Sequence, residues 1–337
     1  MEIQHHISLK NYNTFGIDVK ARSFISVTTV AELQQVLREH SNEKLFILGG
    51  GSNMLLTRDI DALVVHVNLR GREITTTSED YAVVKAMAGE NWHEFVLYTI
   101  ENDLGGLENM SLIPGNVGTT PIQNIGAYGA EIKDTMVSCN AVHIKTGAIR
   151  TFTNEECRFG YRESIFKSAE KDQYVIVAVT FRLTRRHHKI NIGYGDIKKE
   201  LEKAGVDIPT IKDVSNAVIA IRQSKLPDPK VLGNSGSFFK NPIVPVAVYE
   251  QARKKFPEMP NYPIDENYVK VPAGWLIEQA GFKGYRAGDA GVHDRQALVL
   301  VNHGAASGAE LLALSQKIQH TVFEKYGIRI EAEVNVV

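Results

Sequence analysis

Hydrophobic and polar positions follow two different periods along residues 21–66. Residues 22–30, RSFISVTTV, and residues 62–67, ALVVHV, are rich in β-branched residues, and both stretches favour strands. Residues 31–40, AELQQVLREH, place their apolar side chains on one face of a helix. Residues 44–53, KLFILGGGSN, form a short apolar run that leads into glycines, which is typical of a buried strand. This part of the chain therefore predicts a small α/β unit.

The pattern changes after residue 74 to that of a mostly antiparallel sheet. In the middle of the chain, helices are expected only at residues 91–103 and, after the strands of the sheet, at residues 196–205. Strands are expected at residues 79–89, 137–144, 147–153 and 174–186.

The last third of the chain begins with a helix pattern at residue 213 that runs into a Pro-rich break, LPDP. Further helices are expected at residues 245–256 and 307–327, and strands at residues 296–303 and 328–337, while residues 273–284, AGWLIEQAGFKG, are assigned to neither. With a domain boundary near residue 216, the predicted domains are 1–66, 67–215 and 216–337.

The final stretch, IRIEAEVNVV, alternates strictly between apolar and polar residues. Such alternation is typical of a strand with one buried face, so Glu331, Glu333 and Asn335 are expected on the other face. The carboxylates of Glu331 and Glu333 are either solvated or line a site, and the pattern leaves both readings open.

One long segment, SLIPGNVGTTPIQNIGAYGAEI from Ser111 to Ile132, fits neither helix nor strand. It holds four glycines and two prolines and carries no charge before Glu131. Its apolar residues argue against a solvated linker. A loop this long inside a compact domain is either a self-packed Ω-loop or a ligand cradle, and the composition does not decide between them.

Two shorter segments carry residue types suited to binding. LFILGGGSN lacks the third glycine of the dinucleotide fingerprint, where Met54 stands, and it is followed by no Walker-type lysine. Its glycines either allow a ligand close to the backbone or simply make a tight turn. GNSGSFFKNP does not match the nucleophile elbow, so Ser235 and Ser237 are candidates for proton or hydrogen-bond donation, or parts of a serine-rich turn.

An arginine lies among aromatic residues in FGYRESIFK. The forked guanidinium of Arg162 is suited to clamping a carboxylate or phosphate. A surface salt bridge with Glu155 or Glu163 is the alternative reading.

Composition narrows the range of functions. The 337 residues are 43% hydrophobic and 23% charged, with a formal net charge of -1, so no general attraction to nucleic acid or anionic membranes is expected. Cys139 and Cys157 suggest neither a disulfide framework nor a zinc site, and the histidine pairs have no ligand partners at a recognised spacing, so no metal is expected. With neither a signal peptide nor a membrane-length apolar run, we expect a soluble, cytoplasmic monomer.

Taken in order, these segments resemble one family across nearly the whole chain. NTFGI, LGGGSNML, GLENMSLIPGNVGTTPIQNIGAYGAEI, FGYRESIFK, RQSKLPDP, GNSGSFFKNP, AGWLIEQAGFKG and EAEV are similar to the motifs of the UDP-N-acetylenolpyruvoylglucosamine reductases, the MurB family. NIGYGDIKKEL resembles the tyrosine-bearing insertion of the type I members.

The resemblance implies an α+β fold. Two N-terminal subdomains, 1–66 and 67–215, form an FAD-binding fold of the vanillyl-alcohol-oxidase (PCMH) type. Residues 216–337 form an α+β substrate-binding domain, whose last strand is able to pack back on the FAD-binding region.

The resemblance also implies the reaction and its partners. NADPH reduces non-covalently bound FAD, and the enzyme converts UDP-N-acetylglucosamine enolpyruvate to UDP-N-acetylmuramate for peptidoglycan. Hydride reaches the methylene carbon of the enolpyruvyl group, and negative charge then develops beside its carboxylate.

The family's motifs assign roles to individual residues. Arg162 and Glu333 stabilise the developing enolate, where a raised pKa would let Glu333 donate a hydrogen bond, and Ser237 protonates the second carbon. The implied FAD-binding residues are Gly49, Gly50, Gly51, Ser52, Asn53, Ser111, Pro114, Gly115, Thr119, Gln123, Asn124, Gly126, Ala127 and Gly129. The implied substrate-binding residues are Tyr128, Tyr194, Arg222, Lys225, Asn241, Tyr262, Lys283 and Gln296. Asn335 departs from the arginine that is common in the family.

The sequence leaves two other functions open. A flavin oxidase of the same fold is one, although the glycine loops contain no His or Cys to tether a flavin. A nucleotide-sugar-binding protein without catalysis is the other.

Overall fold

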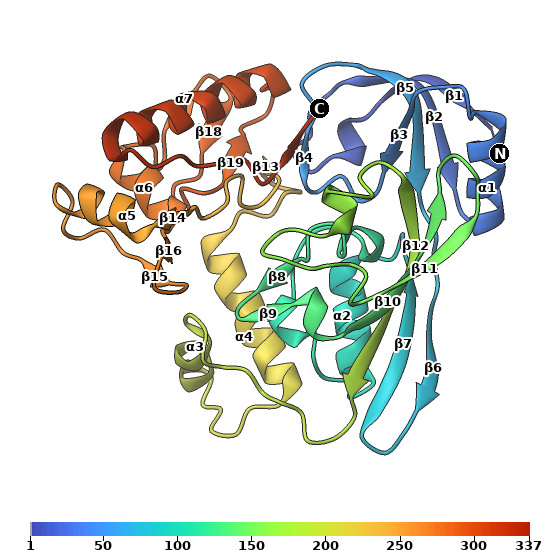
Figure 1. The fold of residues 1–337 in the computed structure, drawn as a ribbon, viewed down its shortest axis with the longest axis horizontal. Coiled ribbons are helices and arrows are strands. Elements are labelled where there is room, and N and C mark those ends of the chain that lie inside the picture. Colours follow the sequence, from blue (N-terminus) through green and yellow to red (C-terminus); the bar gives the residue numbers. More distant parts are fainter. Residues whose placement is uncertain (1) are drawn as a thin grey trace. The chain divides into compact units, whose positions relative to one another are not determined.

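The computed structural model describes residues 2–337 and contains two compact units, each assembled from several stretches of chain (Figure 1). The first unit comprises the chain up to Ile7, Ala21–Gly50 and Ile60–Ser224. The second comprises Ser8–Lys20, Gly51–Asp59 and Lys225–Val337.

A four-stranded sheet with one helix opens the first unit. Its strand order is β1 (Gln4–Ser8), β2 (Lys20–Val27), β5 (Ile60–Val67) and β3 (Leu45–Leu48), and β5 pairs in parallel with both β2 and β3. Helix α1 (Val30–Glu39) begins at a capping box formed by Thr29 and Glu32. It buries Leu33, Val36 and Leu37 in a core shared with β2 and β5.

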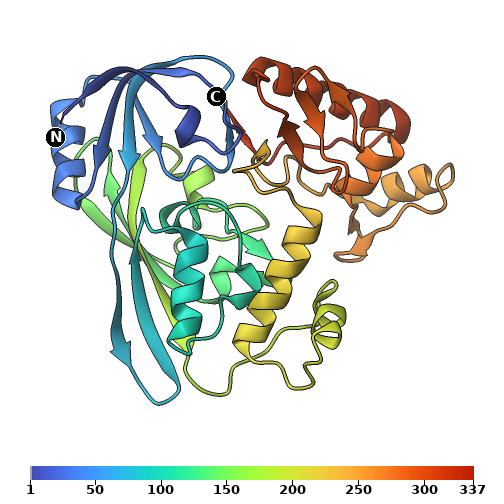
Figure 2. The same cartoon turned by 180° about the vertical axis from the view of Figure 1, so that it is seen from behind.

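An antiparallel sheet forms the rest of the first unit's framework. Its order is β11 (Ile149–Thr153), β10 (Met136–His143), β12 (Tyr174–Thr184), β7 (Tyr81–Met87) and β6 (Arg72–Thr77). Helix α2 (Trp92–Glu101) lies against this sheet, as Figure 2 shows from behind. Trp92 and Phe95 of α2 pack on Phe181 of β12, with ring centroids 6.0 and 5.3 Å from that of Phe181.

Two further helices complete the first unit. α3 (Ile197–Lys203) and α4 (Ile211–Lys225) share a small apolar core, and Tyr128 packs against it. The long loop lies between this pair and the antiparallel sheet, and carries the short strands β8 (Gly126–Ala127) and β9 (Ala130–Glu131).

The second unit contains two small antiparallel sheets and three helices. One sheet has the order β13 (Gly233–Asn234), β19 (Leu300–Asn302), β18 (Ala290–Val292) and β17 (Arg286–Ala287). The other has the order β14 (Ile243–Pro245), β16 (Tyr268–Lys270) and β15 (Tyr262–Pro263). The helices are α5 (Val246–Arg253), α6 (Ala273–Gln279) and α7 (Gly308–Tyr326), and β4 (Met54–Leu55) pairs in parallel with β20 (Asn335–Val336).

Every helix expected from the sequence is present, and so is the mostly antiparallel middle sheet. The expected strand over 328–337 is wrong in extent, because only Asn335–Val336 forms a strand and Ala332 makes an isolated bridge to Phe239. The short partner segments on either side limit the pairing. The alternation itself holds as far as Val334, since Ile328, Ile330 and Val334 are buried.

The three predicted domains stay a prediction. Within residues 2–337, no helix is both long and apolar enough to cross a membrane.

Candidate active site

The two glycine loops of the first unit pack directly on each other. A Cβ atom on Gly49 would lie 2.7 Å from Cγ2 of Thr119, and one on Gly50 would lie 2.8 Å from Oδ1 of Asn116 and 3.1 Å from Cα of Gly115. The first two distances are shorter than real Cβ atoms show, and the third, to backbone, is tighter than nine in ten real Cβ contacts. Glycine therefore lets one loop approach the other closely here, and the two segments form one continuous backbone wall.

The long loop is packed and locally strained. Ile113, Ile122 and Ile125 pack against the core beneath the antiparallel sheet. Leu112, Asn124 and Tyr128 adopt positive φ angles of 59°, 46° and 50°, which non-glycine residues rarely do. Strain of this kind persists only where the surroundings impose it, and it clusters at functional sites.

Hydrogen bonds from neighbouring elements impose these conformations. The fully buried amide of Asn124 donates to the carboxylate of Glu131 at 3.1 Å and to the carbonyl of Gly160 at 3.0 Å, and its oxygen accepts from the N–H of Lys133 at 3.1 Å. Ser111 is also fully buried, and its hydroxyl lies 2.7 Å from that of Ser215 in α4.

The loop offers backbone donors for an anionic or polar ligand. Gly115 is buried with φ of 119°, and among residues 2–337 no acceptor takes its N–H or that of Asn116. A buried N–H without an acceptor is rare unless a ligand supplies one. Pro114, Gln123, Gly126 and Ala127 lie partly exposed along the same loop, and Gly129 is exposed.

Arg162 projects from a tight turn onto this wall. The turn is closed by hydrogen bonds between Gly160 and Glu163, of 3.0 and 3.3 Å, and Arg162 has a φ of 54°. Its guanidinium donates to the carbonyl of Gly126 at 2.7 Å and, more weakly, to that of Asn124 at 3.4 Å. The arginine is thereby directed along the glycine loop, and the loop carbonyls restrict its rotamers.

Three substrate-binding candidates are close together in the first unit. The rings of Tyr128 and Tyr194 meet edge to face, with centroids 6.3 Å apart. The half-buried guanidinium of Arg222, in α4, donates through Nε to the carbonyl of Leu112 at 3.3 Å. Burial lowers the pKa of Arg222, and the neighbouring Tyr128 opposes that shift.

Leu112 is held from its other side by a histidine that the sequence did not single out. Nδ1 of His93, in α2, accepts the N–H of Leu112 at 3.0 Å. Burial lowers the pKa of His93, and the cation of Arg222 lowers it further. The neutral ring can accept this hydrogen bond only through Nδ1, so the proton resides on Nε2.

Ser237 and Glu333 are neighbours within the second unit. The N–H of Glu333 donates to the carbonyl of Phe238 at 2.8 Å, and the N–H of Lys240 donates to the carbonyl of Glu331 at 2.9 Å. These bonds form a short antiparallel pairing between the serine segment and the C-terminal segment. Ser237 is exposed, and no residue in the described chain hydrogen-bonds its hydroxyl.

Buried polar residues hold the serine loop in place. The side-chain oxygen of Asn234 accepts the N–H of Gly236 at 2.9 Å, and its amide donates to the carbonyls of Pro227 and Leu232. The buried hydroxyl of Ser235 lies 3.3 Å from the carbonyl of Met54. Ser235 is thus a structural residue, while Ser237 remains accessible.

The other predicted residues of the second unit lie in several places. Asn241 and Gln296 both lie at the first turn of α6, where Oδ1 of Asn241 accepts the N–H of Ala273 at 2.9 Å. Tyr262 is exposed on β15, and Lys283 pairs with Glu278 at 2.9 Å. Lys225 is the last residue of α4, and Gly51, Ser52 and Asn53 precede β4.

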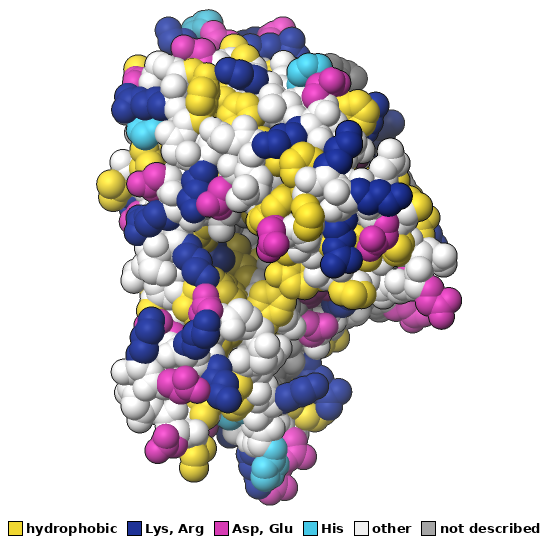
Figure 3. Space-filling view, turned by 90° about the vertical axis from the view of Figure 1, so that its left-hand side faces the viewer, with side chains coloured by type: hydrophobic (Ala, Val, Ile, Leu, Met, Phe, Trp, Pro, Cys, Tyr) yellow, Lys and Arg dark blue, Asp and Glu magenta, His cyan; other side chains and the backbone are white. Residues whose placement is uncertain are grey.

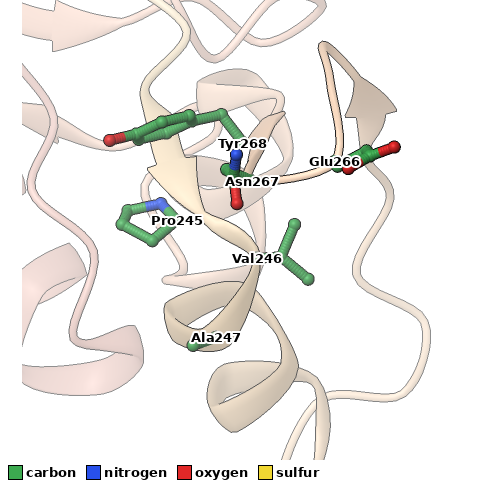
Figure 4. Close-up of a pocket in the computed structure, with 6 residues that line it drawn as sticks. All are labelled: Pro245, Val246, Ala247, Glu266, Asn267 and Tyr268. Carbon is green, nitrogen blue, oxygen red and sulfur yellow. The ribbon is translucent and has the colours of Figure 1, made fainter.

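An open pocket of about 460 Å³ lies at the start of α5 (Figure 4). Pro245, Val246, Ala247, Glu266, Asn267 and Tyr268 line it. No predicted site residue is among them, so we do not place the site there.

Neither charge nor metal-binding groups suggest another site. On the face drawn in Figure 3, basic and acidic side chains are interspersed. Within the described residues, no group of three or more His, Cys, Asp or Glu could hold a metal ion. The structure does bring Cys139 and Cys157 together as buried free thiols, and the hydrogen bond that the Cys139 thiol makes to Cys157, together with burial, raises the pKa of Cys139.

Comparisons with known proteins agree with this geometry. Residues 21–153 match the model of an FAD binding domain, and residues 228–337 match that of the C-terminal domain of UDP-N-acetylenolpyruvoylglucosamine reductase. The reductase of Flavobacterium johnsoniae is 67% identical to this chain over 337 residues, which cover all of both chains. The chain belongs to the UDP-N-acetylenolpyruvoylglucosamine reductase family.

More distant members of the family are also similar to this chain over nearly its full length. The Chromobacterium violaceum reductase is 50% identical over 99% of this chain and 98% of its own. The crystal structure of the Thermus caldophilus reductase (MurB) covers 100% of this chain and 99% of its own at 23% identity, with a TM-score of 0.69, and so shares the fold. The expected α+β FAD-binding fold is confirmed.

Proposed function

We propose that this chain reduces UDP-N-acetylglucosamine enolpyruvate to UDP-N-acetylmuramate, with FAD as bound cofactor and NADPH as electron donor. The observation that carries the proposal is the full-length identity of 67% with a reductase named for this substrate. The geometry supports it independently, because an accessible serine and a glutamate lie on paired segments of backbone and an arginine is directed along a glycine-rich wall.

The residues present fit FAD. Uncharged loops with glycines at their closest approach and N–H groups without protein acceptors are suited to a pyrophosphate and a flat ring system. We propose that the loops at 49–53 and 111–129 hold it through the fourteen residues named from the family motifs. When bound, FAD supplies the hydride, received from NADPH, that reduces the enolpyruvyl double bond.

Arg162 has the chemistry needed beside the substrate carboxylate. Hydride addition leaves negative charge on the adjacent carbon, and this charge spreads into the carboxylate. A permanently charged guanidinium whose position is already fixed stabilises such charge without reorganising during the reaction. The hydrogen bond to Gly126 and the tight turn supply this fixed position.

Ser237 and Glu333 complete the proposed chemistry. Ser237 protonates the carbon that carries the negative charge; a hydroxyl is a weak acid, so its placement and the basicity of the carbanion must both contribute. Glu333 is proposed to donate a hydrogen bond to the enolate oxygen, a role that requires its carboxyl group to carry a proton. The backbone pairing between their two segments supports this assignment, because it keeps the two residues on neighbouring stretches of chain.

The remaining residues are proposed to bind the UDP-sugar. Arg222 and Lys225 supply positive charge for the diphosphate, and Tyr128 and Tyr194 supply aromatic surfaces, with Asn241, Tyr262, Lys283 and Gln296 as further contacts. A cytoplasmic location is part of this proposal, because NADPH and nucleotide sugars are cytoplasmic metabolites. A monomeric state is proposed alongside it.

One experiment tests the proposal. The purified yellow protein is mixed with NADPH, with and without the enolpyruvyl UDP-sugar, while NADPH absorbance is followed. Sustained oxidation that depends on the UDP-sugar is expected. A protein that cannot bind FAD, or one whose NADPH oxidation ignores the UDP-sugar, would overturn it.

A further inference from the structure

The C-terminal segment is tied to the end of the first glycine loop by Asn335. Strand β20 pairs in parallel with β4, with Asn335 opposite Met54. The carbonyl of Asn53 accepts two hydrogen bonds from Asn335, one from the backbone N–H at 3.2 Å and one from the side-chain amide at 2.9 Å. The side-chain bond is the shorter of the two, although Asn335 is exposed.

Asn53 in turn reaches back to Glu333. Its side-chain amide donates to the carbonyl of Glu333 at 3.5 Å, a long hydrogen bond. The N–H of Glu333 is held by the carbonyl of Phe238 at 2.8 Å. The backbone of Glu333 is therefore fixed on one side by the serine loop and on the other by the glycine loop.

We propose that Asn335 is a positioning residue for Glu333. This inference rests on the proposed function, since it assumes that Glu333 acts on the enolate. By fixing the Asn53 carbonyl, the Asn335 amide orients the Asn53 side chain toward the Glu333 peptide. The hydrogen bond from Asn53 then holds the backbone of Glu333 in a single position relative to the glycine loop. Asn335 thus acts through Asn53.

The test compares Asn335→Asp with the wild-type holoenzyme. Aspartate has the same size but presents an oxygen, in place of an N–H donor, to the Asn53 carbonyl. We expect flavin reduction by NADPH to stay within about twofold of wild type, while oxidation of the reduced flavin by the enolpyruvyl UDP-sugar slows by roughly tenfold or more. Asn335→Gln keeps a donor amide and is expected to recover part of that rate.

Thr57→Val is the matched control. The Thr57 hydroxyl donates to the carbonyl of Val337 at 2.6 Å, so this substitution also removes one side-chain hydrogen bond to the C-terminal segment but leaves Asn53 untouched. It is expected to lower the melting temperature without slowing the substrate half-reaction.

Two results would overturn the inference. One is an Asn335→Asp enzyme whose two half-reactions both match those of wild type. The other is a pair of variants, Asn335→Asp and Thr57→Val, that slow the same half-reaction equally, because the C-terminal pairing as a whole would then matter instead of Asn335. Failure of the proposed function can be told apart from failure of this inference. In that case the wild-type protein itself would show no turnover that depends on the UDP-sugar.

Discussion

Glu333 donates its backbone N–H to the carbonyl of Phe238 at 2.8 Å, which places the glutamate beside the residue that directly follows Ser237. These residues are almost a hundred positions apart in the sequence. Because a single short pairing joins them, the proton donor and the enolate-stabilising group that we propose form one structural element. A change at either residue is therefore expected to affect substrate chemistry and to leave flavin reduction unaffected.

Ser237→Ala removes the proposed proton donor. The Ser237 hydroxyl is exposed and makes no hydrogen bond within the described residues, so its loss should hardly affect stability. We expect reduction of the flavin by NADPH to be unchanged and turnover of the enolpyruvyl substrate to fall by far more than tenfold. Stopped-flow measurement of the two half-reactions checks this. Turnover within about tenfold of wild type, a barrier change under roughly 1.4 kcal/mol, would exclude the role.

Glu333→Gln and Glu333→Ala separate two roles of the glutamate. Glutamine retains a hydrogen-bond donor of the same length, whereas alanine removes it. If protonated Glu333 donates a hydrogen bond to the enolate, kcat should fall less in the glutamine variant than in the alanine variant. Both variants keep the backbone bond to Phe238, so their melting temperatures should be similar. Equal losses of kcat would argue against hydrogen-bond donation.

Much of the fold could be predicted because its signals are local. Helix α1 combines an amphipathic period with a capping box at Thr29 and Glu32, and α7 begins at a second capping box formed by Ser307 and Glu310. Strands such as β15 and β17 could not be predicted in this way, because a strand of two residues has no period of its own. Their positions depend on partner strands elsewhere in the chain.

The candidate site could be predicted only from the family's motifs and from their order along the chain. Composition left the long loop undecided between an Ω-loop and a ligand cradle, and the structure shows that glycine packing between loops is one reason for its composition. His93 gave no signal, because its partner is the backbone of Leu112, 19 residues away. The contact of Asn335 with Asn53 spans 282 residues and was equally invisible.

Gly50→Ala tests whether the contact between the two glycine loops supports FAD binding. The new methyl group would lie 2.8 Å from Oδ1 of Asn116 and 3.1 Å from Cα of Gly115, so the Asn116 side chain must turn away and the backbone at Gly115 must shift by a few tenths of an ångström. We expect less FAD per purified protein and a loss of stability of about 1–3 kcal/mol, as is usual for overpacking. The ratio of flavin to protein absorbance measures the first effect.

Gly193→Ala is the control for this substitution. A Cβ atom at Gly193 meets nothing within 4 Å, so its FAD content should equal that of wild type. If Gly50→Ala also retains full FAD content, the close approach of the loops is not needed for cofactor binding.

The lowered pKa of His93 makes the stability of the fold depend on pH. Burial is the larger cause and the cation of Arg222 the next, while Glu94 opposes them. Below about pH 6.5 the unfolded chain therefore binds a proton at this site more readily than the folded chain does. The free energy of unfolding therefore decreases as the pH falls from about 6.5 toward the pKa of His93 in the folded chain. Above about pH 6.5, this histidine no longer changes the free energy of unfolding with pH.

His93→Gln should flatten this part of the profile. Glutamine keeps an oxygen able to accept the N–H of Leu112 but takes up no proton. Melting temperatures measured between about pH 7 and pH 5 should fall less steeply than in wild type, although His66 and His293, whose pKa values are also lowered by burial, keep part of the slope. His187→Gln, at an exposed position, controls for loss of an imidazole. An unchanged slope in His93→Gln would mean that protonation of His93 is not coupled to folding.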